Sequence, residues 1–377
     1  MNADEVGGWL RDHPDPTGDD LARAGLVAPH WPEPWGLGAD AGTTRRIDQA
    51  LATAGVALPD NPIGIGWAGP TILAAGTDAQ RHRYLFPLLS GDDVWCQLFS
   101  EPDAGSDLAS LTTRADRDGD EWVVTGQKIW STSADVAAFG ILLARTDPDA
   151  PKHRGISYFL CPMDLPGIEV RPIREMTGGS HFNEVFLDGA RLPAEALVGA
   201  PGDGWRLARV TLGNERVSLS SGGILWGMGP TGAEVLGLAR DEGVADPRLR
   251  QEVAALHTEA FLADLLGRRV QEAVAADGEP GPEASLKKLL ADEHGQRLME
   301  LVASLAGPDA MVASDAAWPT TLAHRPPPVG GGLGAGHQGE WPWNYLFSRA
   351  LTIGGGTTQV QRNILAEQVL GLPKERS

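Results

Sequence analysis

The middle third of the chain carries a pattern of alternating and β-branched residues that the parts on either side lack. This pattern predicts strands at residues 112–116, 121–125, 139–144, 155–160, 168–172 and 184–187. Asp118-Gly119, between the first two segments, is a strong hairpin signal. Short strands at this spacing predict a compact β-barrel or sandwich between residues 94 and 200.

Helical spacing precedes and follows this β region. The predicted helices span residues 19–27, 45–56, 78–89, 205–226, 246–276, 283–306 and 357–370. In the last of them, Thr358 and Gln361 are spaced as a capping box. Residues 324–340, rich in Pro and Gly, predict a connection. We therefore predict an α+β fold with an N-terminal helical domain (1–93), a middle β domain (94–200) and a C-terminal helical domain (201–377).

Composition excludes several classes of function. The 377 residues include 50 Asp and Glu against 31 Lys and Arg, and the net charge of -19 argues against nucleic acid and anionic membranes as partners. An anionic ligand is still compatible, because local basic groups or helix N-termini can bind one. The acidic N-terminus is not a signal peptide, and the apolar stretch at 222–228 is too short to span a bilayer. We expect a cytoplasmic protein without membrane insertion.

Cysteine and histidine usage gives no sign of a metal centre. Cys96 and Cys161 are the two cysteines, which is too few for a disulfide framework or a zinc site and agrees with a reducing compartment. His181, His257 and His294 are scattered and have no ligand spacing. We predict that the protein binds no metal.

Two segments are crowded with small and hydroxyl-bearing residues. Residues 96–107 read CQLFSEPDAGSD, and residues 354–363 read GGGTTQVQRN. Such segments let backbone N–H groups approach a phosphate or a flat ring closely.

These segments, together with three others, resemble the acyl-CoA dehydrogenase family. The others are VTGQKIWST at 124–132, FNEVFLDGARLP at 182–193 and NILAEQVLGLP at 363–373, all in the family's order. The similarity covers most of the chain from about residue 19. The resemblance implies a helical domain, a β-barrel domain and a four-helix bundle. It also implies FAD, an acyl-CoA (or carrier-bound acyl) thioester as substrate, α,β-dehydrogenation in lipid metabolism, and an electron-transfer flavoprotein as electron acceptor.

The resemblance assigns cofactor contacts residue by residue. The positions that match FAD contacts are Gln97, Phe99, Ser100, Gly105, Ser106, Trp130, Ser131, Thr132, Thr357 and Gln359. Trp130 would pack against the isoalloxazine, Thr132 would donate toward flavin N5, and Ser106 would also lie near the CoA arm. Taken singly, Ser100 and Ser106 also fit turn capping, and Trp130 also fits a core position.

The catalytic base of many family members is a Glu at a position where this chain has Gly355. A minority, resembling the isovaleryl- and long-chain-specific enzymes, place the Glu on an earlier helix. The resemblance then implies that Glu215 is the base, that Arg216 orders the substrate site and that the Gly355 N–H binds the thioester oxygen. A carboxyl group in an apolar cavity has a raised pKa, which suits a general base. The alternative is an ordinary Glu-Arg pair on a helix surface.

Some family features are missing. The Arg-x-x-Phe-Gly segment that contacts FAD across the dimer is not evident, and residues 240–244 read RDEGV near its place. Such departures resemble a divergent bacterial branch that acts on bulky acyl groups, including steroid side chains, and partly forms heteromers. We expect a homodimer or homotetramer, with a heteromer as the alternative. Two other functions stay open: an FAD-holding, catalytically incomplete partner subunit, and an oxygen-using flavin oxidase or monooxygenase.

Overall fold

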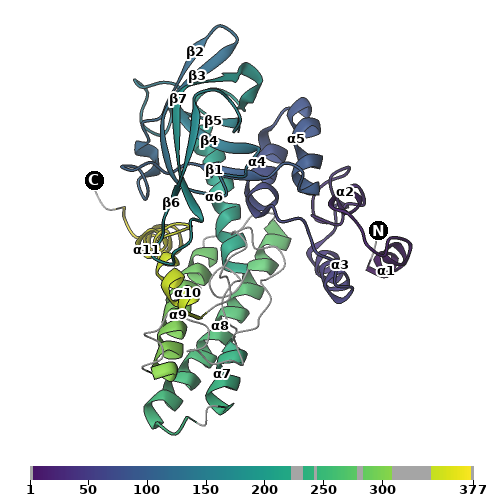
Figure 1. Ribbon diagram of the computed structural model, residues 1–377, viewed down its shortest axis with the longest axis vertical. Helices are drawn as coiled ribbons and strands as arrows, with labels where there is room; N and C mark the ends of the chain where they lie inside the picture. Colours follow the sequence, from purple (N-terminus) through teal and green to yellow (C-terminus); the bar gives the residue numbers. More distant parts are fainter. Residues whose placement is uncertain (1–2, 222–231, 242–243, 278–282, 308–340, 375–377) are drawn as a thin grey trace. The chain divides into compact units, whose positions relative to one another are not determined.

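The computed structural model of the protein describes residues 3–221, 232–241, 244–277, 283–307 and 341–374 (Figure 1). The chain forms two compact units. The first contains the residues up to Glu175 and Ser180–Asn214. The second contains Met176–Gly179 and most of the chain from Glu215 onward. Helices and strands are both abundant, as predicted.

Five α-helices begin the first unit: α1 (Ala3–Asp12), α2 (Gly18–Arg23), α3 (Ala41–Thr53), α4 (Gly69–Ala75) and α5 (Asp78–Ser90). Capping side chains fix where they begin: Thr17 and Thr77 form capping boxes at α2 and α5, and Asp40 accepts a hydrogen bond from the Thr43 N–H at α3. The three predicted helices are confirmed. Helix α1 was not predicted, and helix α4 was missed because its Gly and Pro residues, typical of loops, follow a π-helical turn at Gly64–Ala68.

Eight strands follow: β1 (Trp95–Leu98), β2 (Arg114–Asp118), β3 (Glu121–Thr132), β4 (Phe139–Arg145), β5 (Ile156–Pro162), β6 (Ile168–Ile173), β7 (Phe182–Pro193) and β8 (Leu197–Val198). They form one sheet in the order β6-β7-β3-β2-β4-β5-β8, with β1 beside β4. All six predicted strands are present, and the β2–β3 hairpin turns at Gly119, whose φ is 59°. The short strands β1 and β8 were not predicted.

The central strands β4 and β5 are buried on both faces, which explains their continuous apolar runs. Alternate residues enter two different cores. Ile141 and Tyr158 pack with the N-terminal helices, whereas Leu142 and Phe159 pack in a core inside the β region. Cys161 belongs to that second core, where burial raises the pKa of its thiol to about 12. The N-terminal helices and the sheet of this unit therefore share a hydrophobic core.

Helix α6 (Gly204–Ser221) is tied to this core by hydroxyl groups. Its Thr211 Oγ1 lies 2.8 Å from Thr71 Oγ1 and 3.1 Å from the Tyr158 hydroxyl, and all three side chains are fully buried. Paired hydroxyls in a dry core fix orientation, since any shift leaves a polar atom without a partner. The beginning of α6 therefore has a defined rotation about its axis.

The second unit is helical, with α7 (Gly232–Asp241), α8 (Pro247–Asp277), α9 (Glu283–Ala306), α10 (Trp341–Phe347) and α11 (Thr358–Ile364), which continues as a π-helical turn at Leu365–Val369. Helix α8 packs on α7 and α9, and α10 and α11 pack on α9 (Figure 1). The predictions for α8, α9 and the final helix are confirmed, whereas α7 and α10 were not predicted. The connection predicted at 324–340 lies outside the described residues.

The predicted capping box of the last helix is wrong by one residue. Thr357, not Thr358, caps α11 by accepting a hydrogen bond from the Val360 N–H at 3.2 Å. The Gln361 amide instead donates to the carbonyls of Gly355 and Gly356, both at 3.2 Å. Gln361 therefore supports the turn before the helix rather than the helix itself.

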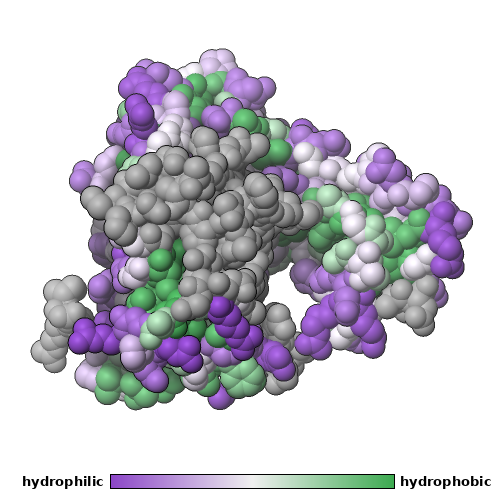
Figure 2. Space-filling view, turned by 60° about the horizontal axis from the view of Figure 1, so that its bottom comes forward, coloured by the Kyte–Doolittle hydropathy of each residue, from purple (hydrophilic) through white to green (hydrophobic). Residues whose placement is uncertain are grey.

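The visible face of the molecule mixes hydrophilic residues with smaller hydrophobic patches (Figure 2). Among the exposed large hydrophobic side chains are Phe261, Leu262 and Leu265 on α8. Of the helices in the described ranges, none combines the length and the apolar character needed to cross a membrane.

Candidate functional site

Trp130 occupies a strained bulge in β3. The pairing of β3 with β7 shifts between Lys128 and Ser131, and Trp130 between them has a φ of 61°. A left-handed conformation is unfavourable for a bulky residue. The indole is nevertheless 56% exposed, and its ring lies edge-to-face with Phe182, at 5.9 Å between ring centroids. The alternative that Trp130 is a plain core residue is therefore wrong, and a strained, exposed aromatic ring is typical of a ligand contact.

The two residues after Trp130 differ in what they can offer. The Ser131 side chain is fully buried, and its backbone carbonyl accepts a hydrogen bond from Asn183 Nδ2 at 3.1 Å. The Ser131 hydroxyl is buried and has no hydrogen-bond partner in the described structure. Thr132 is half-buried and ends the strand.

The segment around Ser100 lies directly beside this bulge. The Ile129 N–H donates to the Ser100 carbonyl at 2.9 Å, so residues thirty positions apart become neighbours. The Phe99 ring is buried edge-on to Tyr158, which leaves only its backbone for a ligand. Of the other predicted contacts here, Gln97 is half-buried, and Gly105 and Ser106 are exposed. The first unit thus brings the segment of Ser100 next to the bulge that carries Trp130.

A buried ion pair joins these two segments. Lys128 Nζ donates to Glu101 Oε1 at 2.8 Å and to the Phe99 carbonyl at 3.1 Å, and the two side chains are 0% and 4% exposed. The Glu101 carboxylate also accepts hydrogen bonds from the N–H groups of Thr112 and Thr113. Because burial disfavours the charged ammonium, the pKa of Lys128 falls to about 8 despite the attraction of Glu101.

Sequence reasoning missed this ion pair, although both residues lie in quoted motifs. The available signal was the alternation of residues along the strand. Lys128 lies on the same buried side of β3 as Trp122 and Val124. A lysine on a buried face needs an acidic partner. Glu101, in the neighbouring motif, is that partner.

The glycine turn before α11 has a backbone that needs glycine. Gly355 and Gly356 have φ values of 66° and 89°, and a Cβ on Gly356 would lie 2.7 Å from Gln361 Nε2. Within the described chain, no acceptor bonds the Gly355 N–H. This turn therefore presents a bare backbone donor, as the predicted thioester contact requires.

A polar pocket of about 500 Å³ lies beside the turn in the second unit. Its lining residues are Glu293, Gln296, Thr352, Ile353, Thr357, Thr358, Gln359 and Arg362. Two predicted FAD contacts, Thr357 and Gln359, are among them. The Thr358 hydroxyl is buried and has no hydrogen-bond partner in the described structure, which is costly unless a ligand or water supplies one. The donors of this pocket fit a group that carries phosphate and hydroxyl oxygens, as FAD does.

Glu215 lies in the part of α6 that belongs to the second unit. Its side chain is 6% exposed, and Arg216 is half-buried. The alternative of an ordinary surface pair is therefore wrong for Glu215. It is one helical turn beyond Thr211, on the same face of α6 as that anchored hydroxyl. Burying a carboxylate is costly unless polar groups around it compensate for the lost hydration.

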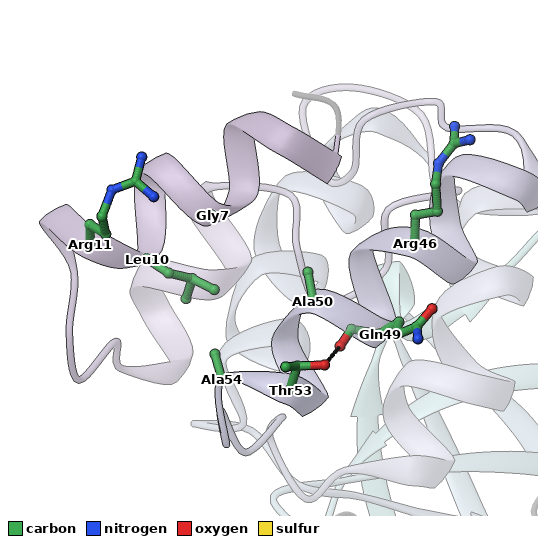
Figure 3. A pocket seen from close by; sticks show the side chains of 8 residues that line it. All are labelled: Gly7, Leu10, Arg11, Arg46, Gln49, Ala50, Thr53 and Ala54. Carbon is green, nitrogen blue, oxygen red and sulfur yellow. Dashed lines mark hydrogen bonds between the residues drawn. The ribbon is translucent and has the colours of Figure 1, made fainter.

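A larger pocket of about 630 Å³ lies elsewhere, between α1 and α3 (Figure 3). Leu10 and Ala50 form its apolar floor, and the side chains of Arg11 and Arg46 point outward at its rim. None of the predicted site residues lines it.

The three histidines noted in the sequence are either paired with carboxylates or exposed. His181 Nδ1 lies 3.2 Å from Glu175, and His294 Nδ1 lies 3.3 Å from Glu259. His257 is exposed. Over the ranges that the structure describes, no three His, Cys, Asp or Glu side chains gather as metal ligands would.

The chain matches three domains of one protein family. These are "Acyl-CoA dehydrogenase, N-terminal domain" over residues 3–92, "Acyl-CoA dehydrogenase, middle domain" over 96–189 and "Acyl-CoA dehydrogenase, C-terminal domain" over 202–370. It is 45% identical over 354 residues to acyl-CoA dehydrogenase FadE34 of Mycobacterium tuberculosis, covering 94% of this chain but 46% of that protein. The chain thus spans about half the length of FadE34. It is 39% identical to acyl-CoA dehydrogenase IpdE1 of the same organism, covering 94% of this chain and 87% of that protein.

Solved structures show the same fold. The structure described as "Tcur3481-Tcur3483 steroid ACAD" superposes with a TM-score of 0.77 at 30% identity, covering 98% of this chain and 91% of that one. The ChsE4-ChsE5 complex from Mycobacterium tuberculosis superposes with a TM-score of 0.75 at 28% identity, covering 99% and 97%. With three family domains in order and IpdE1 matched over most of its length, the chain belongs to the acyl-CoA dehydrogenase family, a family of oxidoreductases.

Proposed function

We propose that the protein is an FAD-dependent acyl-CoA dehydrogenase in which Glu215 removes the α-proton of the acyl thioester. Bound FAD would supply the acceptor for the hydride that leaves the β-carbon. The observation that carries the proposal is the buried Glu215 together with glycine at 355. The chain thus has a dry carboxylate at the family's earlier base position and no side chain at the later one.

The exposed face of Trp130 would pack against the flavin ring, with the Thr132 hydroxyl donating toward flavin N5. The backbone around Ser100, with Gly105 and Ser106, would contact the ribityl and phosphate part of the cofactor. The half-buried Gln97 and the backbone of Phe99 and Ser131 would provide further contacts to the cofactor. The unpartnered Thr358 hydroxyl supports cofactor binding by the neighbouring Thr357 and Gln359.

Removal of an α-proton needs a polarised thioester carbonyl. The Gly355 N–H would donate to that oxygen, and it has no competing acceptor in the described part of the chain. Arg216, the residue after the base, would order the substrate side of the site. A base and a donor held in place before the reaction stabilise the developing enolate without reorganisation.

The relatives favour a bulky acyl group. One solved relative is named a steroid ACAD, and Gly354, Gly355 and Gly356 leave no side-chain volume at their turn. We propose a CoA thioester of a bulky, steroid-type acyl chain, oxidised with an electron-transfer flavoprotein as acceptor. The setting would be the cytoplasm.

A second candidate function is an FAD-holding partner subunit in a heteromer. It is favoured by a relative of 28% identity that was solved as a complex of two different chains, ChsE4 and ChsE5. Glu215 favours the catalytic alternative instead, because a buried carboxylate stands at the family's earlier base position. A homodimer or homotetramer is the assembly we propose.

The test is an anaerobic titration of the FAD-loaded protein with acyl-CoAs of short, long, branched and steroid type. Bleaching of the oxidised flavin band by one class would establish dehydrogenation and its substrate class. If none bleaches the flavin, or if the isolated chain does not bind FAD, the partner-subunit function becomes the better explanation. Rapid reoxidation of the reduced flavin in air would instead indicate an oxygen-using relative.

A further inference from the structure

Helix α9 carries a row of polar side chains on a face that is otherwise buried. Lys288 and Asp292 are 1% and 3% exposed, and Gln296 follows at the same spacing. Residues four apart lie on one helix face, so the three form a continuous stripe. Burying such groups is costly unless each has a partner. The partners of these three side chains therefore indicate their role.

Among the described residues, the hydrogen-bond partners that Lys288 and Gln296 have outside α9 lie in the short segment that leads to the glycine turn. Lys288 Nζ donates to Asp292 Oδ2 and, at 3.3 Å, to the Leu351 carbonyl. Gln296 Nε2 donates to the Ser348 carbonyl at 3.0 Å and to Thr352 Oγ1 at 3.1 Å. The stripe thus binds the backbone of residues 348–352, just before Gly354, to α9.

The far side of the turn is held by a single side chain. Gln361 Nε2 donates to the carbonyls of Gly355 and Gly356. The three glycines themselves have no side chains with which to fix their conformation, and glycine is the most flexible residue. Backbone hydrogen bonds close the two ends of this segment, from the Gly354 N–H to the Ala350 carbonyl at 2.9 Å and from the Thr358 N–H to the Thr352 carbonyl at 3.1 Å. Side chains of α9 before the turn and Gln361 after it add the remaining restraints.

We infer that Lys288, held in place by Asp292, is a positioning residue that fixes the Gly355 N–H in the direction needed to bind the thioester oxygen. It acts through the Leu351 carbonyl and touches neither substrate nor cofactor. The inference rests on the proposed function for the role of the Gly355 N–H. Restraint of the turn by α9 is a separate claim that can be tested without substrate.

The informative variant is the double substitution Lys288→Met with Asp292→Leu. Removing only Lys288 would leave a buried, unpaired carboxylate, which is strongly destabilising. The double variant removes both charges and puts apolar side chains of similar shape in their place, so the fold is expected to persist. It still loses the hydrogen bond to the Leu351 carbonyl. Lys287→Met, on the neighbouring residue of α9, is the matched control, because Lys287 lies instead near Gly267 of α8.

The first measurement is hydrogen–deuterium exchange of the full chain without FAD. The amides of residues 351–358 should exchange on the order of tenfold faster in the double variant, the size expected from losing a hydrogen bond to a charged group. Lys287→Met should leave them unchanged. Unchanged exchange in the double variant would overturn the inference, since the turn would then be held by other contacts.

The second measurement is steady-state kinetics of the loaded enzyme with the acyl-CoA that bleaches the flavin. Loss of orientation at the thioester oxygen should lower kcat by about tenfold or more with a smaller change in KM. Faster exchange with unchanged kcat would overturn the catalytic part of the inference. Failure of every acyl-CoA to bleach wild-type flavin would overturn the proposed function instead, and the exchange experiment would still decide whether α9 restrains the turn.

Discussion

The ammonium of Lys128 and the carboxylate of Glu101 lie 2.8 Å apart with almost no access to solvent. This ion pair connects the segment of Phe99 and Ser100 to the strand that carries Trp130. Two predicted parts of the flavin site are thus joined by groups that would be costly to separate. The pair gives the first prediction.

Lys128→Met should lower the free energy of unfolding by about 3–5 kcal/mol, because it leaves the Glu101 carboxylate buried without its counter-ion. Urea unfolding of the chain without FAD measures the change. Lys152→Met is the matched control, since Lys152 lies at the same 2.8 Å from Asp107 but both side chains are about half exposed. That variant should lose less than about 1 kcal/mol. Equal losses in the two variants would contradict the importance of burial.

Stability should depend on pH in opposite directions at two buried carboxyls. Burial raises the pKa of Glu101, but Lys128 and the Thr112 and Thr113 hydrogen bonds bring it down to about 2, from 4.5. Its contribution is therefore present above pH 4.5 and is lost as the pH falls toward 2. Burial raises the pKa of Asp292 to about 6, from 3.8, although Lys288 opposes the shift. Its contribution is present below pH 3.8 and is lost as the pH rises through 6.

Glu101→Gln should accordingly flatten the loss of stability between pH 4.5 and 2, and Asp292→Asn should flatten the change between pH 3.8 and 6. Denaturant titrations at several pH values in each window measure both slopes. The two substitutions should affect only their own windows. If Asp292→Asn also removed the acid-induced loss below pH 3.8, the assignment of the two carboxyls would be wrong.

Trp130→Ala should separate cofactor binding from stability. The ring is 56% exposed and the backbone has a φ of 61°, so the folded chain without FAD loses little apolar burial. We expect its free energy of unfolding to change by less than about 1 kcal/mol. The dissociation constant for FAD should rise on the order of tenfold or more, since stacking with the ring is lost. Fluorescence titration with FAD measures it, and unchanged FAD affinity would remove Trp130 from the site.

Gly355→Glu, which puts an acid at the usual family position, should fail to create a base. The φ of 66° disfavours any side chain, and we expect a loss of about 1–2 kcal/mol in the free energy of unfolding. Gly354→Ala is the control, because the φ of Gly354 is not positive. Activity in a chain that combines Gly355→Glu with Glu215→Gln would show that the turn accepts the later base after all.

The sequence predicted the strands well because alternation and the Asp118-Gly119 turn are local signals. It missed α4, whose Gly and Pro residues are favoured in loops but pack here against a fixed core. It placed the cap of α11 one residue too late, because Thr357 and Thr358 are equivalent in sequence and only the turn geometry distinguishes them. The division into domains 1–93, 94–200 and 201–377 stays a prediction.

The site residues were predicted from motifs. A motif identifies the residues of a site but not the distant side chains that hold them in place. Lys128, Lys288 and Gln361 act through hydrogen bonds to backbone carbonyls far along the chain or across a turn. No local pattern reveals such partners. The burial of Glu215 could likewise be seen only in the folded structure, because a Glu-Arg pair on a helix is usually exposed.

The central claim is that Glu215 is the base, and anaerobic stopped-flow reduction of the flavin by the best acyl-CoA tests it most directly. Glu215→Gln keeps the size of the side chain and removes its basicity. We predict that FAD and the acyl-CoA still bind to this variant while the rate of flavin reduction falls by a factor on the order of 10³ or more. Reduction at a rate close to that of the wild type would contradict the account and place the base elsewhere in the chain.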